Sequence, residues 1–115
     1  LMTGNELATA VQHDLPIVLI IANNSMYGTI RMHEEREYPG REIATHLRNP
    51  DFVAWAEAFG AQGERVTTTE EFRPAMERAL AAGRPAVIEL VVDQELIASN
   101  FTLSQLRERV RTAAG

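Results

Sequence analysis

A run of short polar residues follows the most apolar segment of the sequence. Asn23-Asn24-Ser25-Met26-Tyr27-Gly28 comes shortly after the apolar run Ile17–Ile21. Two asparagine side chains offer neutral oxygen ligands, and an irregular turn adds main-chain carbonyls and amides. This set suits a hard cation such as Mg2+, which prefers oxygen ligands and often shares them with phosphates. On composition alone, ordinary turn chemistry after a strand is the favoured interpretation of these residues.

The basic residues narrow the chemistry further. All 11 are arginine, so the 115-residue chain has no lysine for a Schiff base or a P-loop, and it has no cysteine for a disulfide or a thiolate metal site. Catalysis would have to come from carboxylates, three histidines, amides, hydroxyls, backbone groups or a bound cofactor. The net charge of -5 argues against a nucleic-acid partner, which would need a basic stripe.

The elements around the polar run follow from hydrophobic pattern and helix caps. The β-branched run Ile17–Ile21 predicts a strand covered on both faces, as in a parallel sheet. Two further strands are expected at residues 62–66 and 86–92. Four helices alternate with these strands, and their starts are marked by polar caps at Thr3 with Glu6, Asn49 before Pro50, Thr68 with Glu71, and Thr102 with Gln105. This order predicts an α/β fold with a parallel sheet and helices on both faces.

The segment from Met26 to Arg48 has a weak pattern, with room for a helical turn or two between Ile30 and Glu37. Its charged run His33–Glu37 is typical of a solvated helix face, although irregular segments after a buried strand also carry binding loops. The turn Tyr38–Arg41 is a candidate for a mobile loop over a substrate. Two histidines, His13 and His46, are expected at the surface without a carboxylate partner.

No segment predicts a membrane span or a secretory signal. The longest apolar run, Ile17–Ala22, is far shorter than the ~20 residues that cross a bilayer. The start of the chain lacks the basic region of a signal peptide. We therefore expect a cytoplasmic protein without a membrane partner.

Several segments in order resemble thiamine diphosphate (ThDP) enzymes. Leu1–Ala10, Leu15–Val18 and the polar run that ends at Gly28 are similar to the C-terminal, diphosphate-binding domain of the acetolactate synthase, pyruvate decarboxylase and benzoylformate decarboxylase group. Segments at residues 49–52, 58–61 and 85–89 fall where that domain has corresponding ones. The resemblance covers about Leu1 to Glu95.

The resemblance implies ThDP and Mg2+ as cofactors. In that family a Gly-Asp-Gly motif and a downstream Asn-Asn pair together hold Mg2+, which anchors the diphosphate. Asn24 matches the asparagine that gives its side-chain oxygen to the metal, and Met26 matches the residue that gives its main-chain carbonyl. The cofactor-binding loop would comprise Asn24, Ser25, Met26, Tyr27 and Gly28.

The sequence also departs from the family. The Gly-Asp-Gly motif would lie just before Leu1, so residues 1–115 read as a diphosphate-binding domain that is truncated at its N-terminal side. The glutamate that activates the cofactor belongs to another domain, and no residue here is assigned a catalytic role. Ile30 stands where pyruvate decarboxylases have a catalytic glutamate, and His33 stands where some relatives line the substrate channel.

The resemblance therefore implies an enzyme, although this chain alone is expected to be inactive. The parent would decarboxylate or ligate a 2-keto acid and would be a homodimer or homotetramer. The alternative is a free-standing, non-catalytic α/β domain with a regulatory or protein-binding role. A phosphoacceptor version of that alternative would need acidic residues at the strand ends, where Asn23 and Asn24 supply neutral amides instead.

Overall fold

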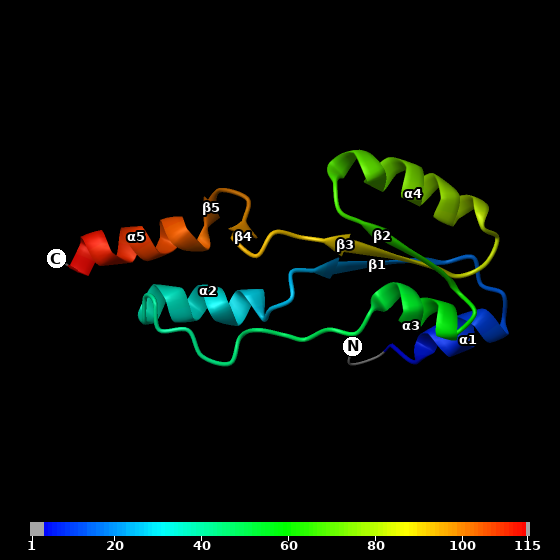
Figure 1. Ribbon diagram of the computed structural model, residues 1–115, viewed down its shortest axis with the longest axis horizontal. Helices are drawn as coiled ribbons and strands as arrows, with labels where there is room; N and C mark the ends of the chain where they lie inside the picture. The colour runs from blue at the N-terminus through cyan, green and yellow to red at the C-terminus, as the bar shows by residue number, and fades with distance from the viewer. Residues whose placement is uncertain (1–3, 115) are drawn as a thin grey trace. The chain divides into compact units, whose positions relative to one another are not determined.

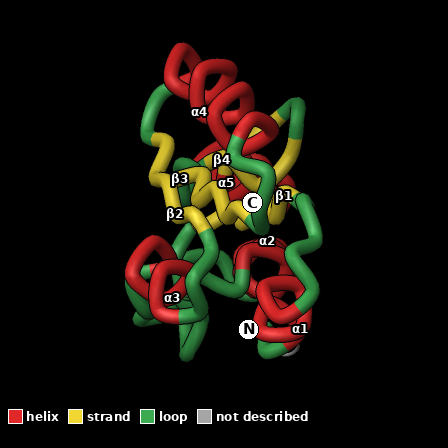
Figure 2. The backbone as a smooth tube through the Cα atoms, turned by 90° about the vertical axis from the view of Figure 1, so that its right-hand side faces the viewer, coloured by secondary structure: helices red, strands yellow, loops and turns green. Residues whose placement is uncertain are grey.

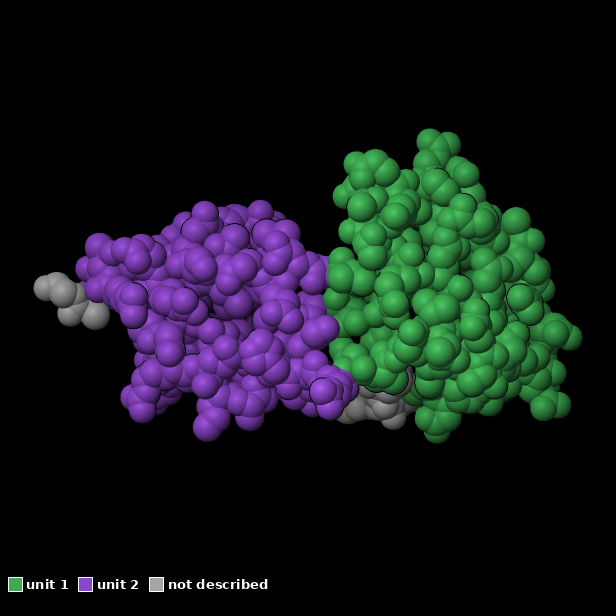
Figure 3. Space-filling view, viewed as in Figure 1, with its two compact units in different colours: residues 1–23, 49–91 green, residues 24–48, 92–115 purple. Residues whose placement is uncertain are grey.

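The structure, a computed structural model, describes residues 4–114 and divides the chain into two units (Figure 3). Unit 1 comprises Leu1–Asn23 and Asn49–Val91, and unit 2 comprises Asn24–Arg48 and Val92–Gly115. The elements of unit 1 are α1 (Glu6–Gln12), β1 (Val18–Asn23), α3 (Phe52–Ala58), β2 (Gln62–Val66), α4 (Thr69–Ala81) and β3 (Ala86–Val91) (Figure 1). Those of unit 2 are α2 (Gly28–Glu37), β4 (Leu96–Ala98), β5 (Phe101–Thr102) and α5 (Leu103–Ala114).

Unit 1 is built on a parallel sheet with strand order β1-β3-β2. Ala86 of the central strand stands opposite Val18 on one side and Gln62 on the other. Helix α4 covers one face of the sheet, and α1 and α3 cover the other (Figure 2). The predicted fold class, an α/β fold with a parallel sheet and helices on both faces, is confirmed.

Alternating residues of β3 supply the core on both sides of the sheet. Ile88 packs with residues of α4, and Val87 packs with residues of α1 and α3. On the second side the rings of Trp55 and Phe59 meet edge to face, with their centroids 5.3 Å apart. These two aromatic side chains therefore pack against the core on this side of the sheet.

The first strand is less buried than its sequence predicts. We expected coverage on both faces, but Leu19 is 37% exposed and Ile20 is 45% exposed. Within the described residues, β1 pairs only with β3 and forms one edge of the sheet. The expectation fits β3 instead, where Ala86, Val87 and Ile88 are each 1% exposed.

Two helix starts follow the sequence and one does not. Thr68 and Glu71 form the predicted capping box of α4. Thr102 and Gln105 exchange hydrogen bonds at the start of α5, as predicted. The prediction that Asn49 caps α3 is wrong, because the cap is Asp51, whose carboxylate accepts hydrogen bonds from the next turn of backbone.

The N-cap of α1 is Asn5, and the expected partner Thr3 lies outside the described residues. Glu6 is the first residue of this helix. His13 is exposed at its C-terminal end, as predicted.

Unit 2 contains more regular structure than its sequence predicts. Helix α2 runs for 10 residues, where a turn or two was expected. The short strands β4 and β5 form an antiparallel pair that the sequence analysis missed. None of the helices described for residues 4–114 has the length and apolar character needed to cross a membrane.

Candidate functional site

The residues that the sequence singled out form one tight loop between β1 and α2. The side-chain Oδ1 of Asn24 accepts a hydrogen bond from the Met26 amide at 3.2 Å. Between them, Ser25 has a positive φ of 53°, which is uncommon for a residue other than glycine. Backbone held in this region is often found where a loop serves a ligand.

A second segment of unit 2 supports this loop through backbone hydrogen bonds. The Tyr27 amide donates to the Thr45 carbonyl and the Leu47 amide donates to the Ser25 carbonyl, both at 2.8 Å. Met26 and His46 face each other in an antiparallel bridge. In such a pair the flanking residues make the bonds, so the amide and carbonyl of Met26 point away from residues 45–47. The Met26 carbonyl therefore lies on the side where Asn24 Oδ1 accepts the Met26 amide.

The loop leads into the N-terminus of α2, which is open. A hollow of about 370 Å³ lies here, lined by Met26, Tyr27, Gly28, Thr29 and Ile30. Helix α2 has no side-chain cap and no acidic residue in its first turn. Among the described residues, no carboxylate caps its first amides, and the helix dipole favours an anion at this end.

Gly28 is required by this geometry. A Cβ at this position would lie 2.8 Å from Nδ2 of Asn24, which is too close for the two atoms to remain in place. The glycine thus lets the asparagine amide pack directly against the start of α2.

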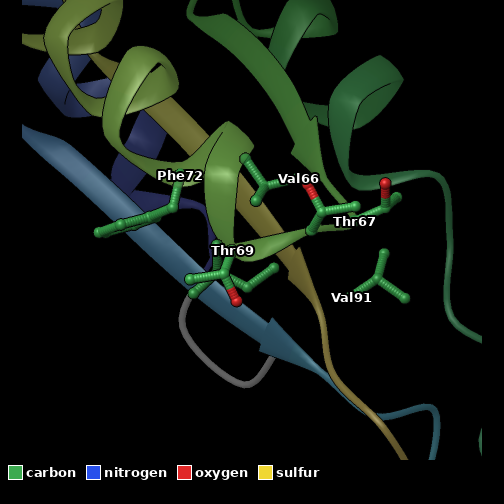
Figure 4. A pocket seen from close by; sticks show the side chains of 7 residues that line it. Val66, Thr67, Thr69, Phe72 and Val91 are labelled. Carbon is green, nitrogen blue, oxygen red and sulfur yellow. The ribbon is translucent and has the colours of Figure 1, made fainter.

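The N-terminus of α4 makes a useful contrast. A hollow of about 310 Å³ lies beside it, lined by residues of β2, the loop between β2 and α4, α4 and β3. Val66, Thr67, Phe72 and Val91 are among these residues (Figure 4). Here Glu71 accepts hydrogen bonds from the amides of Thr67 and Thr68, which lower the pKa of its carboxyl. A carboxylate already occupies the end of this helix, so a second anion is disfavoured. The start of α2 is the better candidate for an anion.

The described residues hold no group of three or more His, Cys, Asp or Glu side chains that could bind a metal. A divalent cation at the loop would therefore depend on neutral oxygens from this chain, on the ligand's own oxygens, and on ligands from elsewhere. The Asn24 side chain and the Met26 carbonyl supply two such neutral oxygens. Their type fits Mg2+, which is held by few protein ligands together with phosphate oxygens.

A polar network in unit 1 was missed by the sequence analysis. Glu89 on the central strand is 3% exposed, and its carboxylate accepts from Asn23 Nδ2 at 2.6 Å and from Arg65 Nε at 2.7 Å. Asn49 donates to Asn23 at 2.8 Å, and Arg65 also reaches Asp51, the cap of α3, at 3.0 Å. The sequence does contain one signal for this network, which is the glutamate within the apolar segment 86–92. A carboxylate buried in such a strand needs hydrogen-bond partners from neighbouring elements.

The charged run of α2 is only partly a solvated face. His33, Arg36 and Glu37 are exposed, as predicted. Glu35, in contrast, is 0% exposed and is paired with Arg31 of α2 and Arg107 of α5. The prediction is therefore wrong for Glu35, because the carboxylate faces α5, an element whose position the sequence did not reveal.

One smaller expectation is wrong, and the turn after α2 makes a contact that the sequence did not predict. His46 was expected to lack a carboxylate partner, but its Nε2 lies 3.1 Å from Oε1 of Glu42. In the turn after α2, the Gly40 amide donates a hydrogen bond to Oε1 of Glu35 at 2.6 Å. His33 accepts a hydrogen bond at Nδ1 from Arg36 at 2.8 Å on the exposed side of α2.

Comparison with known proteins identifies the family. Residues 1–90 match the family described as thiamine pyrophosphate enzyme, C-terminal TPP binding domain. The chain belongs to this family. Thiamine pyrophosphate is another name for ThDP, so the predicted family is confirmed. The loop Asn24–Gly28 lies within the matched region.

Individual relatives agree with this assignment. The chain is 38% identical over 100 residues to the acetolactate synthase large subunit of Corynebacterium glutamicum, a match that covers 82% of this chain and 16% of that protein. It is 36% identical over 94 residues to the mitochondrial acetolactate synthase of Schizosaccharomyces pombe, covering 82% of this chain and 14% of that protein. The chain thus spans about a sixth of the length of these relatives.

A solved structure shows the same fold. The ThDP-dependent 4-hydroxybenzoylformate decarboxylase of Rhodococcus jostii RHA1 matches with a TM-score of 0.69 and 37% identity, over 76% of this chain and 16% of that one. The homologues are ThDP-dependent enzymes, which supports an enzyme as the parent of this chain.

Proposed function

We propose that residues 1–115 are the diphosphate-binding domain, truncated at its N-terminal side, of a longer acetolactate synthase-like enzyme that decarboxylates or ligates 2-keto acids. The observation that supports this most directly is the open N-terminus of α2 within the family region. Within residues 4–114, no side chain caps this end and no acidic residue lies in its first turn to compete with an anion.

In this proposal, different groups of the loop bind the metal ion and the diphosphate. Asn24 Oδ1 and the Met26 carbonyl would ligate Mg2+, and the amides around Tyr27 and Gly28 would face the diphosphate. Ser25 shapes the turn between the two metal ligands through its left-handed backbone. When bound, ThDP would supply a nucleophilic carbon for chemistry at the carbonyl of the 2-keto acid.

The protein's own contribution at this loop is positioning and electrostatics. The positive end of the α2 dipole offsets phosphate charge, which matters in a chain without lysine. Ile30 is exposed at the hollow and has no ionisable group, so it cannot take the part of the glutamate that pyruvate decarboxylases have at the matching position. We therefore propose that the chain alone is inactive and binds ThDP weakly.

The remaining proposals concern the parent enzyme. A homodimer or homotetramer is proposed because this group builds its sites between chains. Cysteine-free composition fits a reducing compartment, and we propose the cytoplasm.

The test compares the 115-residue chain with the longer polypeptide that contains it. Calorimetry with ThDP and Mg2+, together with a 2-keto acid decarboxylation assay, should give tight binding and turnover only for the longer polypeptide. Asn24→Ala in that polypeptide should raise the Kd for ThDP by at least about tenfold, or ~1.4 kcal/mol. Asn100→Ala, in the exposed turn of the β4–β5 hairpin, is the matched control and should leave the Kd unchanged.

Two results would contradict the proposal. Turnover by the isolated chain would rule out its role as an incomplete domain. A longer polypeptide that binds no ThDP would favour the alternative of a non-catalytic α/β domain.

A further inference from the structure

An ion pair between a buried glutamate and a partly exposed arginine joins the two main helices of unit 2. Arg107 of α5 donates to both carboxylate oxygens of Glu35 on α2, from Nε at 2.5 Å and from Nη2 at 3.1 Å. Arg31, one turn earlier on α2, reaches Glu35 Oε2 at 2.7 Å. The Glu35 side chain is fully buried and the Arg31 side chain is 7% exposed.

The same arginine continues the contacts into the segment after α2. Arg31 Nη2 lies 3.4 Å from Glu42 Oε2. The other oxygen of Glu42 accepts from the Thr45 hydroxyl at 2.5 Å and lies 3.1 Å from His46 Nε2. Thr45 is itself 1% exposed, so the hydrogen bond to Glu42 is made by a buried residue of this segment.

Thr45 and its neighbours are the backbone support of the cofactor loop. The Thr45 carbonyl accepts the Tyr27 amide, and Leu47 donates to Ser25. A continuous series of contacts therefore runs from Arg107 through Glu35, Arg31 and Glu42 to Thr45, and from there to the loop Asn24–Gly28. All of these residues belong to unit 2.

We propose that Glu35 and Arg107 are positioning residues for the loop Asn24–Gly28. Helix α5 lies beyond residues 1–90, the part that matches the family. A segment outside the recognised domain thus sets the shape of the cofactor loop. This inference rests on the proposed function, which makes that loop the ThDP site.

The arrangement suits positioning better than simple stabilisation. Buried ion pairs often contribute no more stability than apolar residues of similar size, but they fix orientation because one geometry satisfies them. Arg31 Nη1 is buried without a hydrogen-bond partner among the described residues, which is a cost that a purely stabilising cluster would avoid. The two hydrogen bonds from Arg107 also fix the orientation of the Glu35 carboxylate relative to α5. A lysine at the same position would not reproduce this two-point contact.

The experiment uses the full-length enzyme that contains this chain. Arg107→Ala should raise the Kd for ThDP, measured by calorimetry at saturating Mg2+, by about tenfold, as removal of groups that orient ligands does elsewhere. The kcat at saturating ThDP should change less than the Kd. Arg109→Ala removes the same charge from the same helix, where Arg109 lies over the Phe101 ring, and should leave the Kd unchanged.

Arg107→Lys separates positioning from folding. It keeps the charge beside Glu35 but not the two-point contact, so it should fold like the wild type and still weaken ThDP binding. If either folded variant loses thermal stability with an unchanged Kd, the contact is merely structural and the inference is overturned. If the wild-type enzyme binds no ThDP, the proposed function itself fails. If the wild-type enzyme binds ThDP and both variants bind it with the same Kd, only this inference is refuted.

Discussion

Asn23, the last residue of β1, donates a hydrogen bond from Nδ2 to Oε1 of the buried Glu89 at 2.6 Å. Arg65 of β2 approaches the second oxygen of the same carboxylate. One side chain on the central strand therefore links both outer strands on a single face of the sheet. It does so at the strand ends that precede α2 and α4.

Removal of this carboxylate should destabilise unit 1. In Glu89→Ala, the amide of Asn23 loses its acceptor and Arg65 loses its closest partner, so the free energy of unfolding should fall by about 2 kcal/mol. Urea unfolding followed by the fluorescence of the single tryptophan, Trp55, measures this. Glu57→Ala, an exposed substitution on the neighbouring helix α3, is the control. Equal midpoints for the two variants would contradict the prediction.

Glu35 should make the stability of the chain sensitive to acid. The hydrogen bond from Arg107 is the main cause that holds the pKa of Glu35 below its ordinary 4.5, against the opposing effect of burial. The unfolded state then binds the proton more readily than the folded state. The stabilisation is therefore complete above the unfolded pKa and is lost as the pH falls through the folded pKa.

The comparison variant for this pH effect is Glu35→Gln. Above pH 4.5 it should unfold more easily than the wild type by about 3 kcal/mol, because it breaks a buried pair. The gap should narrow as the pH falls below 4.5 and through the lowered pKa of the folded-state Glu35, because the wild-type carboxylate then becomes protonated. Denaturant unfolding followed by circular dichroism tests this, and a gap that stays constant with pH would refute it.

Gly28→Ala should damage ThDP binding more than stability. The new Cβ would displace the Asn24 amide, which lies 2.8 Å from its position, and would disturb the proposed metal ligand. In the longer enzyme we expect the Kd for ThDP to rise about tenfold or more. Gly83→Ala is the control: its φ of 62° is strained for alanine, but nothing lies within 4 Å of its Cβ. It should lower the melting temperature and leave the Kd unchanged.

The isolated 115-residue chain should associate with itself. Its edge strand β1 exposes Leu19 and Ile20, and open strand edges with apolar side chains favour pairing with another chain. Sedimentation coefficients should rise with protein concentration, and Ile20→Arg should reduce that rise. A monomer at every concentration would count against the prediction.

Local features of the fold could be predicted from the sequence. The capping box of α4 depends on Thr68 and Glu71, three residues apart, and the alternation of strands and helices fixed the fold class. The loop Asn24–Gly28 could be predicted as a candidate cofactor site because its residues are consecutive and follow a strand. Asp51 displaced Asn49 as the cap of α3 by a difference of two positions, which sequence pattern resolves poorly.

Contacts between distant residues could not be predicted. Glu35 and Arg107 are 72 positions apart, and Asn23 and Glu89 are 66 apart. Glu35 stands in a run of charges that suggests solvent exposure, and only the placement of α5 makes it buried. The exposure of β1 likewise depends on which strands flank it, which its own apolar composition does not encode.

The strand order β1-β3-β2 also constrains how the chain acquires its structure during synthesis. Strands β1 and β2 each pair only with β3 among the described residues, and β3 is the last of the three to be made. A ribosome that has translated the protein as far as residue 80 of this chain therefore holds two strands whose shared partner among the described residues is still missing. Both pairings require residues 86–91, so a chain stopped before Ala86 should lack this three-stranded sheet and be prone to aggregation.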